Sequence, residues 1–432
     1  MLKPRTALIL FFSFLALNFP RGELWAQDFV LTLEEACGRA LEADRALQKA
    51  ALDLGLARTK ANSAWAEFFP TLNAGAGLDY GIPLSGPGGE PGYSASARLS
   101  LGFNTGLPLT LKNNNLEYLI RLADYEAGRL DRITETSKTF YSLLAQEKNL
   151  EVLDGARRLA EEQLQRDRVA RQSGYLGELD FLSSSLSAET AKLDYSGALS
   201  EYLTALGEFL VGLGLDQRGG VKLEGTIEVS RFTGKAEELI GAALPRRLDL
   251  RTQRYEIERL QNAEALAGRA AKGPSLDLSA SWGLSPSGFD KAIGTGLSLT
   301  LPLDPWVPNS KRHQVLKSAA VEVEKGRLDL KEKEDAARTT IRSLVLSLEN
   351  GWNEIETARL RVSIAQRAYE LSEQGYRRGS LNFLDFETAR NRLTSARQQQ
   401  LQSEIKYKLL FLDLAKALNS GEAELNEAGK GE

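Results

Sequence analysis

The sequence carries one short pattern twice, and this duplication limits the folds that the chain can adopt. In each copy a glycine is followed five residues later by Leu-Asp-Phe, first at residues 174–181 and again at residues 379–386. Each copy ends a long run of helical spacing and opens a shorter one. Because glycine tolerates the left-handed backbone that ends many helices, we expect each copy to form the tip of a helical hairpin. A repeat of this kind predicts an internal duplication of the architecture.

Long segments with helical spacing lead into and away from both tips. Residues 112–173 and 310–378 contain little Gly or Pro and predict helices on the order of 90 Å long, at about 1.5 Å per residue. Apolar residues three and four positions apart predict coiled-coil packing between these helices. Shorter helices, of about 54 Å, are expected at residues 33–68, 178–213, 236–271 and 383–418. Two short helices placed end to end would match one long helix.

Four shorter segments alternate between apolar and polar side chains, and this period of two predicts strands. They form two pairs, at residues 72–80 with 94–103 and at residues 275–284 with 297–303. Their length and alternation suit a transmembrane barrel, although an ordinary half-buried sheet alternates in the same way. Four strands are fewer than the roughly eight of the smallest bacterial barrels, and an open edge in lipid leaves backbone groups without partners. In a membrane, the strands of several chains would have to be pooled.

The N-terminus has the layout of a secretory signal peptide. Lys3 and Arg5 precede an apolar run at residues 7–17, and the small residue Ala26 follows, so we expect cleavage after Ala26. The residue directly after that site is Gln27 and not a cysteine, so we expect no lipid anchor there. No later stretch approaches the roughly 20 apolar residues of a membrane helix, so any insertion into a membrane is expected to use strands.

The composition argues against catalysis. The chain has one Cys and one His, which disfavours a Cys/His metal site, a disulfide framework and a Ser-His-Asp triad. The net charge of −4 offers no basic excess for nucleic acid. We therefore expect no enzyme, no cofactor, no metal site and no nucleic-acid partner.

These features together predict the organisation of the chain. Residues 1–26 form the signal peptide, and residues 27–235 form a first structural repeat of helix, two strands, long helix, tip, short helix and a small mixed segment. Residues 236–420 form a second repeat, and the polar tail at residues 421–432 is expected to be disordered. The expected fold class is mainly α with a β-barrel part.

In this arrangement the sequence resembles the TolC-like outer-membrane efflux proteins. The resemblance covers nearly the whole mature chain. It is carried by LTLEEA at residues 31–36, FPTL at 69–72, RLDL at 247–250, LPL at 301–303 and both tip patterns.

The resemblance implies a homotrimeric exit duct for small molecules or proteins in the outer membrane. Four transmembrane strands from each protomer would build one twelve-stranded barrel, and the helices would form a coiled-coil tunnel across the periplasm. The tunnel would dock the periplasmic adaptor of an inner-membrane transporter, in a tripartite pump or a type I secretion system.

The resemblance also implies a gate near the tips. Asp180 and Tyr376 match an acid and a tyrosine that hold the family's tip closed, so we expect a hydrogen bond between them. The family's arginine position is Leu381 here, so one ionic link is absent. The family's two constriction acids fall on Asp385 and Thr388, and only the first is kept. From the residues alone, Asp180 and Asp385 could equally be carboxylates that stabilise a helix N-terminus, and Tyr376 could be hairpin packing.

The tips themselves are candidates for docking the adaptor. Gly174, Leu176, Gly379 and Leu381 fall at the two hairpin ends, where an exposed apolar residue indicates a partner contact.

One alternative from another class stays open. A soluble periplasmic coiled-coil adaptor or scaffold protein would account for the signal peptide and the long helices. It would not account for two strand pairs, each lying between helices of opposite direction.

Overall fold

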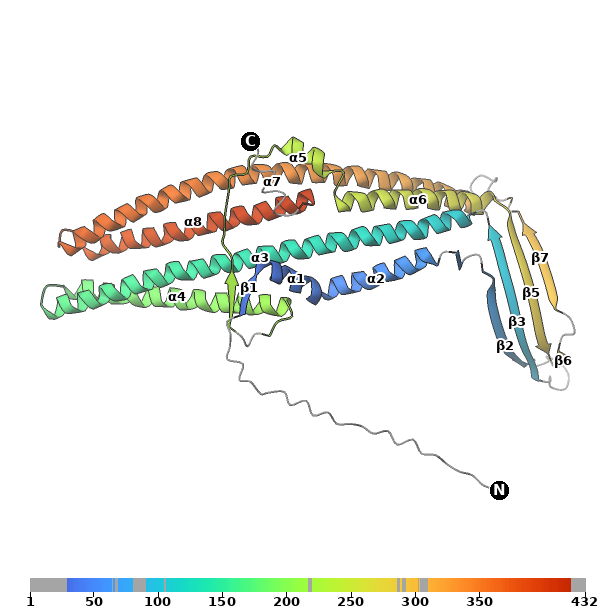
Figure 1. Ribbon diagram of the computed structural model, residues 1–432, viewed down its shortest axis with the longest axis horizontal. Coiled ribbons are helices and arrows are strands. Elements are labelled where there is room, and N and C mark those ends of the chain that lie inside the picture. The colour runs from blue at the N-terminus through green and yellow to red at the C-terminus, as the bar shows by residue number, and fades with distance from the viewer. Residues whose placement is uncertain are drawn as a thin grey trace, which may run out of the picture.

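The structure is a computed structural model that describes residues 29–63, 65–66, 69–80, 91–104, 106–216, 220–285, 288–289, 293–301, 303 and 310–420. The expected signal peptide, the tail at 421–432 and most of the loop at 81–92 lie outside the described residues. The molecule is elongated, with a sheet at one end, two hairpin tips at the other, and helices that run lengthwise between them (Figure 1).

Two long helices connect the sheet to the tips. Helix α3 spans Leu107–Gln172 and α7 spans Lys311–Arg377, with 66 and 67 residues. Each reverses into a shorter helix, α4 at Glu178–Gly212 and α8 at Phe383–Leu418. Both helical hairpins predicted from the duplicated pattern are therefore present, with ends within a few residues of those expected.

The other two short helices are each broken in two, and here the prediction of continuous helices was wrong. The first consists of α1, Leu33–Ala43, and α2, Arg45–Asn62. Asp44 separates them because its carboxylate accepts hydrogen bonds from the backbone N–H groups of Ala46 and Leu47 and so caps α2. Thr32 caps α1 through the backbone N–H of Glu35, as the capping box predicts.

The second break lies between α5, Ala236–Ala243, and α6, Leu248–Lys272. Pro245 stands between the two helices. Proline lacks the N–H that a helix interior requires, which ends α5. The backbone then becomes extended at Arg247, with φ −60° and ψ 127°, and α6 begins at the next residue.

Helix α3 is the central helix of the layer. In the half nearer the sheet it lies between α2 and α6, and in the half nearer the tips it lies between α4 and α8. Helix α7 packs against α6 and then α8 on one side. Within this chain, α2, α4 and α7 are therefore the lateral edges of the helical layer.

The main apolar core lies near the middle of the molecule, where the short helices meet. One cluster joins α5, α7 and α8 with Phe232, and a second joins α1, α3 and α4 with Leu31 and Leu223. Strand β1, Phe29–Thr32, pairs in parallel with β4, Val221–Glu224, beside the second cluster. The sequence had indicated a small mixed segment after residue 221 but not β1, which is too short to show a period of its own.

The large sheet contains four main antiparallel strands in the order β2, β3, β5, β7. Strand β2 spans Thr71–Tyr80, β3 spans Pro91–Asn104, β5 spans Ser275–Ser285 and β7 spans Gly294–Thr300. The two-residue strand β6, Gly288–Phe289, pairs only with the end of β5. The long edges of β2 and β7 carry no partner strand in the described part of the chain.

The pairing register places all the apolar side chains on one face of this sheet. Leu72 lies opposite Leu99, and Leu278 lies between Leu101 and Leu297. The other face carries small and polar residues, in rows such as Asn73–Arg98–Ser281–Gly294 and Thr71–Ser100–Ser279–Gly296. The alternation in the sequence is therefore confirmed as a two-faced sheet. Among the described helices, none combines the length and the apolar character needed to cross a membrane.

A hydrogen-bonded tyrosine fastens the irregular segment after β4 to the core, which gives a prediction about stability. The Tyr407 hydroxyl accepts from the backbone N–H of Phe232 at 2.9 Å and donates to the Ser230 carbonyl at 2.8 Å. We expect Tyr407→Phe to cost about 1–3 kcal/mol, because the buried Phe232 N–H would lose its partner. The thermal unfolding midpoint of the purified protein measures the effect. Tyr175→Phe, at a side chain that is 89% exposed, is the matched control and should leave the midpoint unchanged.

Candidate functional site

Both tips have the backbone that the duplicated glycines predict. Gly174 has φ 76° and Gly379 has φ 73°, in the left-handed region. At each tip a backbone N–H reaches back five residues, from Tyr175 to Ala170 and from Ser380 to Gly375, which closes the end of the long helix. A Cβ atom built at either glycine would meet no atom within 4 Å. The glycines are therefore required for backbone conformation and not for close packing.

The phenylalanine that ends each copy of the pattern packs back onto the preceding long helix. Phe181 lies under the guanidinium of Arg171, 4.6 Å from the ring centroid. Phe386 stacks on Tyr376, with ring centroids 5.2 Å apart and an angle of 9° between the rings. The shared aromatic position thus holds each hairpin together just inside its tip.

Tyr376 joins the second hairpin to the first, but through a different acid from the one expected. Its hydroxyl donates to Oδ1 of Asp167 at 3.0 Å, and the side-chain amide of Gln163 donates to the same oxygen at 2.7 Å. Asp167 is 3% exposed, and among the described atoms its Oδ2 has no hydrogen-bond partner. The predicted bond from Tyr376 to Asp180 is therefore wrong within this chain.

The reason lies in which helix faces the second hairpin. Asp167 is on α3, which packs against α8 in this half of the molecule, whereas Asp180 is in the first turn of α4 and borders the groove between α4 and α8. Burial raises the pKa of Tyr376, and the negative charges of Asp167 and then Asp180 raise it further. The hydroxyl is therefore protonated at neutral pH and can act as the donor. No sequence pattern marked Asp167, which lies two helical turns before the tip.

Leu381, which stands at the family's arginine position, is turned into the second hairpin. It is half-buried and packs with Tyr376 against a cluster of Tyr369, Phe383, Phe386 and Leu393. Leu381 thus contributes to apolar packing within one hairpin.

The side chains that the tips expose are different from those expected. Leu176 and Leu381 are both half-buried. The apolar residues that are exposed near the tips are Tyr175, Leu179 and Leu384, at 89%, 77% and 71%. Gly174 and Gly379 are exposed, as expected.

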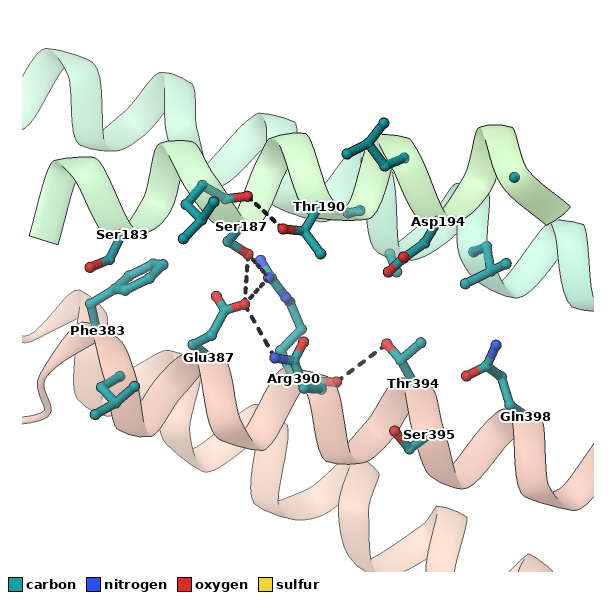
Figure 2. A pocket seen from close by; sticks show the side chains of 18 of the residues that line it. Ser183, Ser187, Thr190, Asp194, Phe383, Glu387, Arg390, Thr394, Ser395 and Gln398 are labelled. Atoms are coloured by element: carbon teal, nitrogen blue, oxygen red, sulfur yellow. Dashed lines mark hydrogen bonds and ion pairs between the residues drawn. The ribbon is translucent and has the colours of Figure 1, made fainter. Parts of the chain in front are cut away.

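A groove of about 1010 Å³ separates the two hairpins above the tips. Its walls are α4 and α8, and Leu153 and Ala156 of α3 also line it. Figure 2 shows Ser187 on α4 pointing across the groove toward Glu387 and Arg390 on α8. Ser187 donates to Glu387 at 2.6 Å, Arg390 pairs with Glu387 at 2.6 Å, and Arg390 also donates to Ser187. This partly buried cluster is a direct polar link between the two hairpins.

Asp385 lies on another face of α8 and is not brought together with Asp180 or Tyr376. Its backbone N–H is capped by the Asn382 side chain at 2.9 Å, and its carboxylate is exposed at the groove between α7 and α8. Thr388 lines the same groove. In the described part of the chain, no cluster of His, Cys, Asp or Glu has the geometry of a metal site.

Long helical hairpins that carry an open-edged, two-faced sheet form the subunit fold of outer-membrane channels. The CmeC outer membrane channel of Campylobacter jejuni matches with a TM-score of 0.74 at 17% identity, over 92% of this chain and 89% of that one. VceC of Vibrio cholerae matches with a TM-score of 0.72 at 18% identity, over 90% and 96%. The open state of the MtrE channel of Neisseria gonorrhoeae matches with a TM-score of 0.73 at 20% identity, over 90% and 89%.

The sequence itself defines the family. Residues 36–210 and 239–420 match the outer membrane efflux protein model, so the chain belongs to that family. The resemblance expected from the sequence motifs is thereby confirmed. No protein among the curated sequences matches the chain.

The contact at Tyr376 gives a prediction that separates the two candidate acids. We expect Tyr376→Phe and Asp167→Asn each to loosen the joint between the hairpins, because a hydrogen bond to a charged acceptor is worth about 1.5–3 kcal/mol. Faster hydrogen exchange of the backbone amides near residues 163–172 and 372–386 measures the loosening. Asp180→Asn is the matched control and should change exchange little. Loosening by Asp180→Asn but not by Asp167→Asn would contradict the assignment.

Proposed function

We propose that this chain is the protomer of a trimeric exit duct in the outer membrane, through which small molecules or proteins leave the cell. The observation that carries the proposal is the four-stranded sheet with two long unpaired edges and one exposed apolar face. Backbone groups at such edges cannot stay unpaired in lipid, so β2 of one protomer is expected to pair with β7 of the next. Three protomers would close one twelve-stranded barrel.

The apolar face of the sheet has the exposure that a lipid contact requires. Leu72, Leu297 and Leu299 are at least 70% exposed in the isolated chain. The opposite face, with its serines, glycines and Asn73, suits a water-filled lumen.

The helical layer also has edges that another protomer would cover. The side of α7 that faces away from α6 and α8 carries exposed apolar residues at near-heptad spacing. They are Val321, Leu328, Leu346, Leu360 and Leu371. Leu182, Leu186 and Leu193 form a second exposed stripe on α4, at spacings of four and seven. We infer that these edges meet between protomers and close a helical tunnel that extends into the periplasm.

The tips supply the contact with the rest of an export system. We infer that the exposed residues Tyr175, Leu179 and Leu384, with Gly174 and Leu176 beside them, dock a periplasmic adaptor that links the duct to an inner-membrane transporter. Gly379 and Leu381 shape the second tip. The N-terminal segment would direct the chain to this location as a signal peptide, without a lipid anchor at the cleavage site.

The joint between the hairpins is the proposed gate. Tyr376 and Asp167 hold the two hairpins of one protomer together, and Asp180 lies close enough for its charge to act on Tyr376. Opening of the duct would separate these groups, and Tyr376→Phe should accordingly raise the single-channel conductance in planar bilayers. Asp385 is the constriction acid in this proposal.

We expect the mature protein to form a detergent-stable trimer that remains in outer membranes after carbonate extraction. The reason is that four strands cannot close a barrel alone. Analytical ultracentrifugation with detergent matching measures the oligomer. A monodisperse monomer that extracts with carbonate would favour the alternative, a soluble periplasmic coiled-coil adaptor or scaffold.

The two faces of the sheet should respond differently to charge. Leu278→Arg, on the apolar face, should cost about 2–4 kcal/mol near the bilayer midplane. Ser279→Arg, the adjacent residue on the polar face, should be tolerated because its side chain would enter the lumen. The yield of folded trimer after refolding into lipid vesicles measures both. Equal losses for the two variants would contradict the assigned faces.

A further inference from the structure

A polar stripe runs along α8 on the side that borders α7. Its residues recur every three or four positions, the spacing at which one face of a helix repeats, and none of them is apolar. They are Asp385, Thr388, Arg392, Ser395, Gln399 and Gln402. The stripe contrasts with the exposed apolar stripe of α7 that we assign to a neighbouring protomer. A polar face of this length suits water and not another helix.

The other wall of this groove comes from α7. Arg361 lines it over most of its length, and the small side chains of Ala365 and Ala368 leave room toward the tip. Two adjoining parts of the groove, of about 510 and 450 Å³, are both lined by Arg361, Thr388 and Arg392. Arg361 of α7 and Arg392 of α8 therefore border the same groove as Asp385.

The charges in this groove do not cancel. Arg361, Arg392 and Asp385 are all exposed, and in the described part of the chain none of them belongs to an ion pair within 4.0 Å. Farther from the tip, Lys406 and Glu354 pair at 3.0 Å and add no net charge. The other residues that line the two parts nearest the tip are neutral. Each protomer thus presents two guanidinium groups and one carboxylate.

We propose that Arg361 and Arg392 make the constriction of the duct selective for anions, so that the duct favours anionic cargo. This inference rests on the proposed trimeric duct with Asp385 facing its lumen. Because Arg361 and Arg392 line the same groove as Asp385, a lumenal Asp385 places both arginines in the lumen as well. Three copies bring six guanidinium groups against three carboxylates, and the surplus positive charge concentrates anions at the narrow end.

The test is the reversal potential of single channels in planar bilayers under a gradient of potassium chloride. The wild-type duct should pass chloride in preference to potassium. Arg392→Gln should bring the permeability ratio near unity, because three arginines then balance three aspartates. The double variant Arg361→Gln with Arg392→Gln should reverse the preference, Asp385→Asn should strengthen it, and Arg392→Lys should retain it. All differences should shrink in molar salt, where the screening length falls from about 10 Å to about 3 Å.

Arg367→Gln is the matched control. Arg367 lies on α7, as Arg361 does, but it is paired with Glu370 at 3.1 Å and does not line this groove. It should leave the reversal potential unchanged. A cation-selective wild type, or an equal shift for Arg367→Gln and Arg392→Gln, would overturn the inference while leaving the duct intact. A wild type that forms no channels would instead overturn the proposed function. If Arg392→Gln does not assemble, Arg361→Gln and Asp385→Asn must still shift the potential in opposite directions, and a failure to do so would also overturn the inference.

Discussion

The unpaired backbone at the two edges of the large sheet constrains the rest of this structure. Strands β2 and β7 each offer a row of N–H and C=O groups without a partner strand in the described chain, and the leucines of the same sheet are exposed. Open strand edges occur on many soluble proteins, whereas a sheet face of exposed leucines is rare on them. Together they describe a surface that cannot remain single in lipid, because lipid supplies no hydrogen bonds. In the proposed duct, neighbouring protomers pair the edges and lipid covers the apolar face.

The helices also leave lateral edges uncovered, so uncovered edges extend along the whole molecule. A layer in which α3 is central and α2, α4 and α7 lie at the edges has no closed core of its own. Its best-packed part is the middle, where the clusters around Leu31 and Tyr407 lie beside the short sheet of β1 and β4. The breaks at Asp44 and Pro245 are near this middle region. Only α3 and α7 therefore run without interruption from the sheet to the tips. The tips are thereby held far from the sheet by two uninterrupted helices.

At the tips, apolar packing within the second hairpin and one buried hydrogen bond connect the side chains. Leu381 contributes to an aromatic cluster, and that cluster fixes the ring of Tyr376 against Phe386. The fixed ring directs the hydroxyl to Asp167. A joint built in this way depends little on salt, because its acceptor is 3% exposed and poorly screened. Arg361, Arg392 and Asp385 remain exposed in the groove between α7 and α8.

Local sequence determined the features that depend on periodicity and on single residue types. The alternation of residues 72–80 fixed the two faces of the sheet, helical spacing fixed α8 at Phe383–Leu418, and Gly174 and Gly379 fixed the turns because only glycine adopts their backbone readily. Pro245 was visible in the sequence as a helix breaker, although its effect was not predicted. The tertiary structure alone decided the partner of Tyr376, the burial of Leu381, the pairing of β1 with β4, and the groove that gathers Arg361, Arg392 and Asp385. Each of these features depends on contacts between elements that are tens to hundreds of residues apart in the sequence. No local pattern in a single sequence encodes which of these elements face each other.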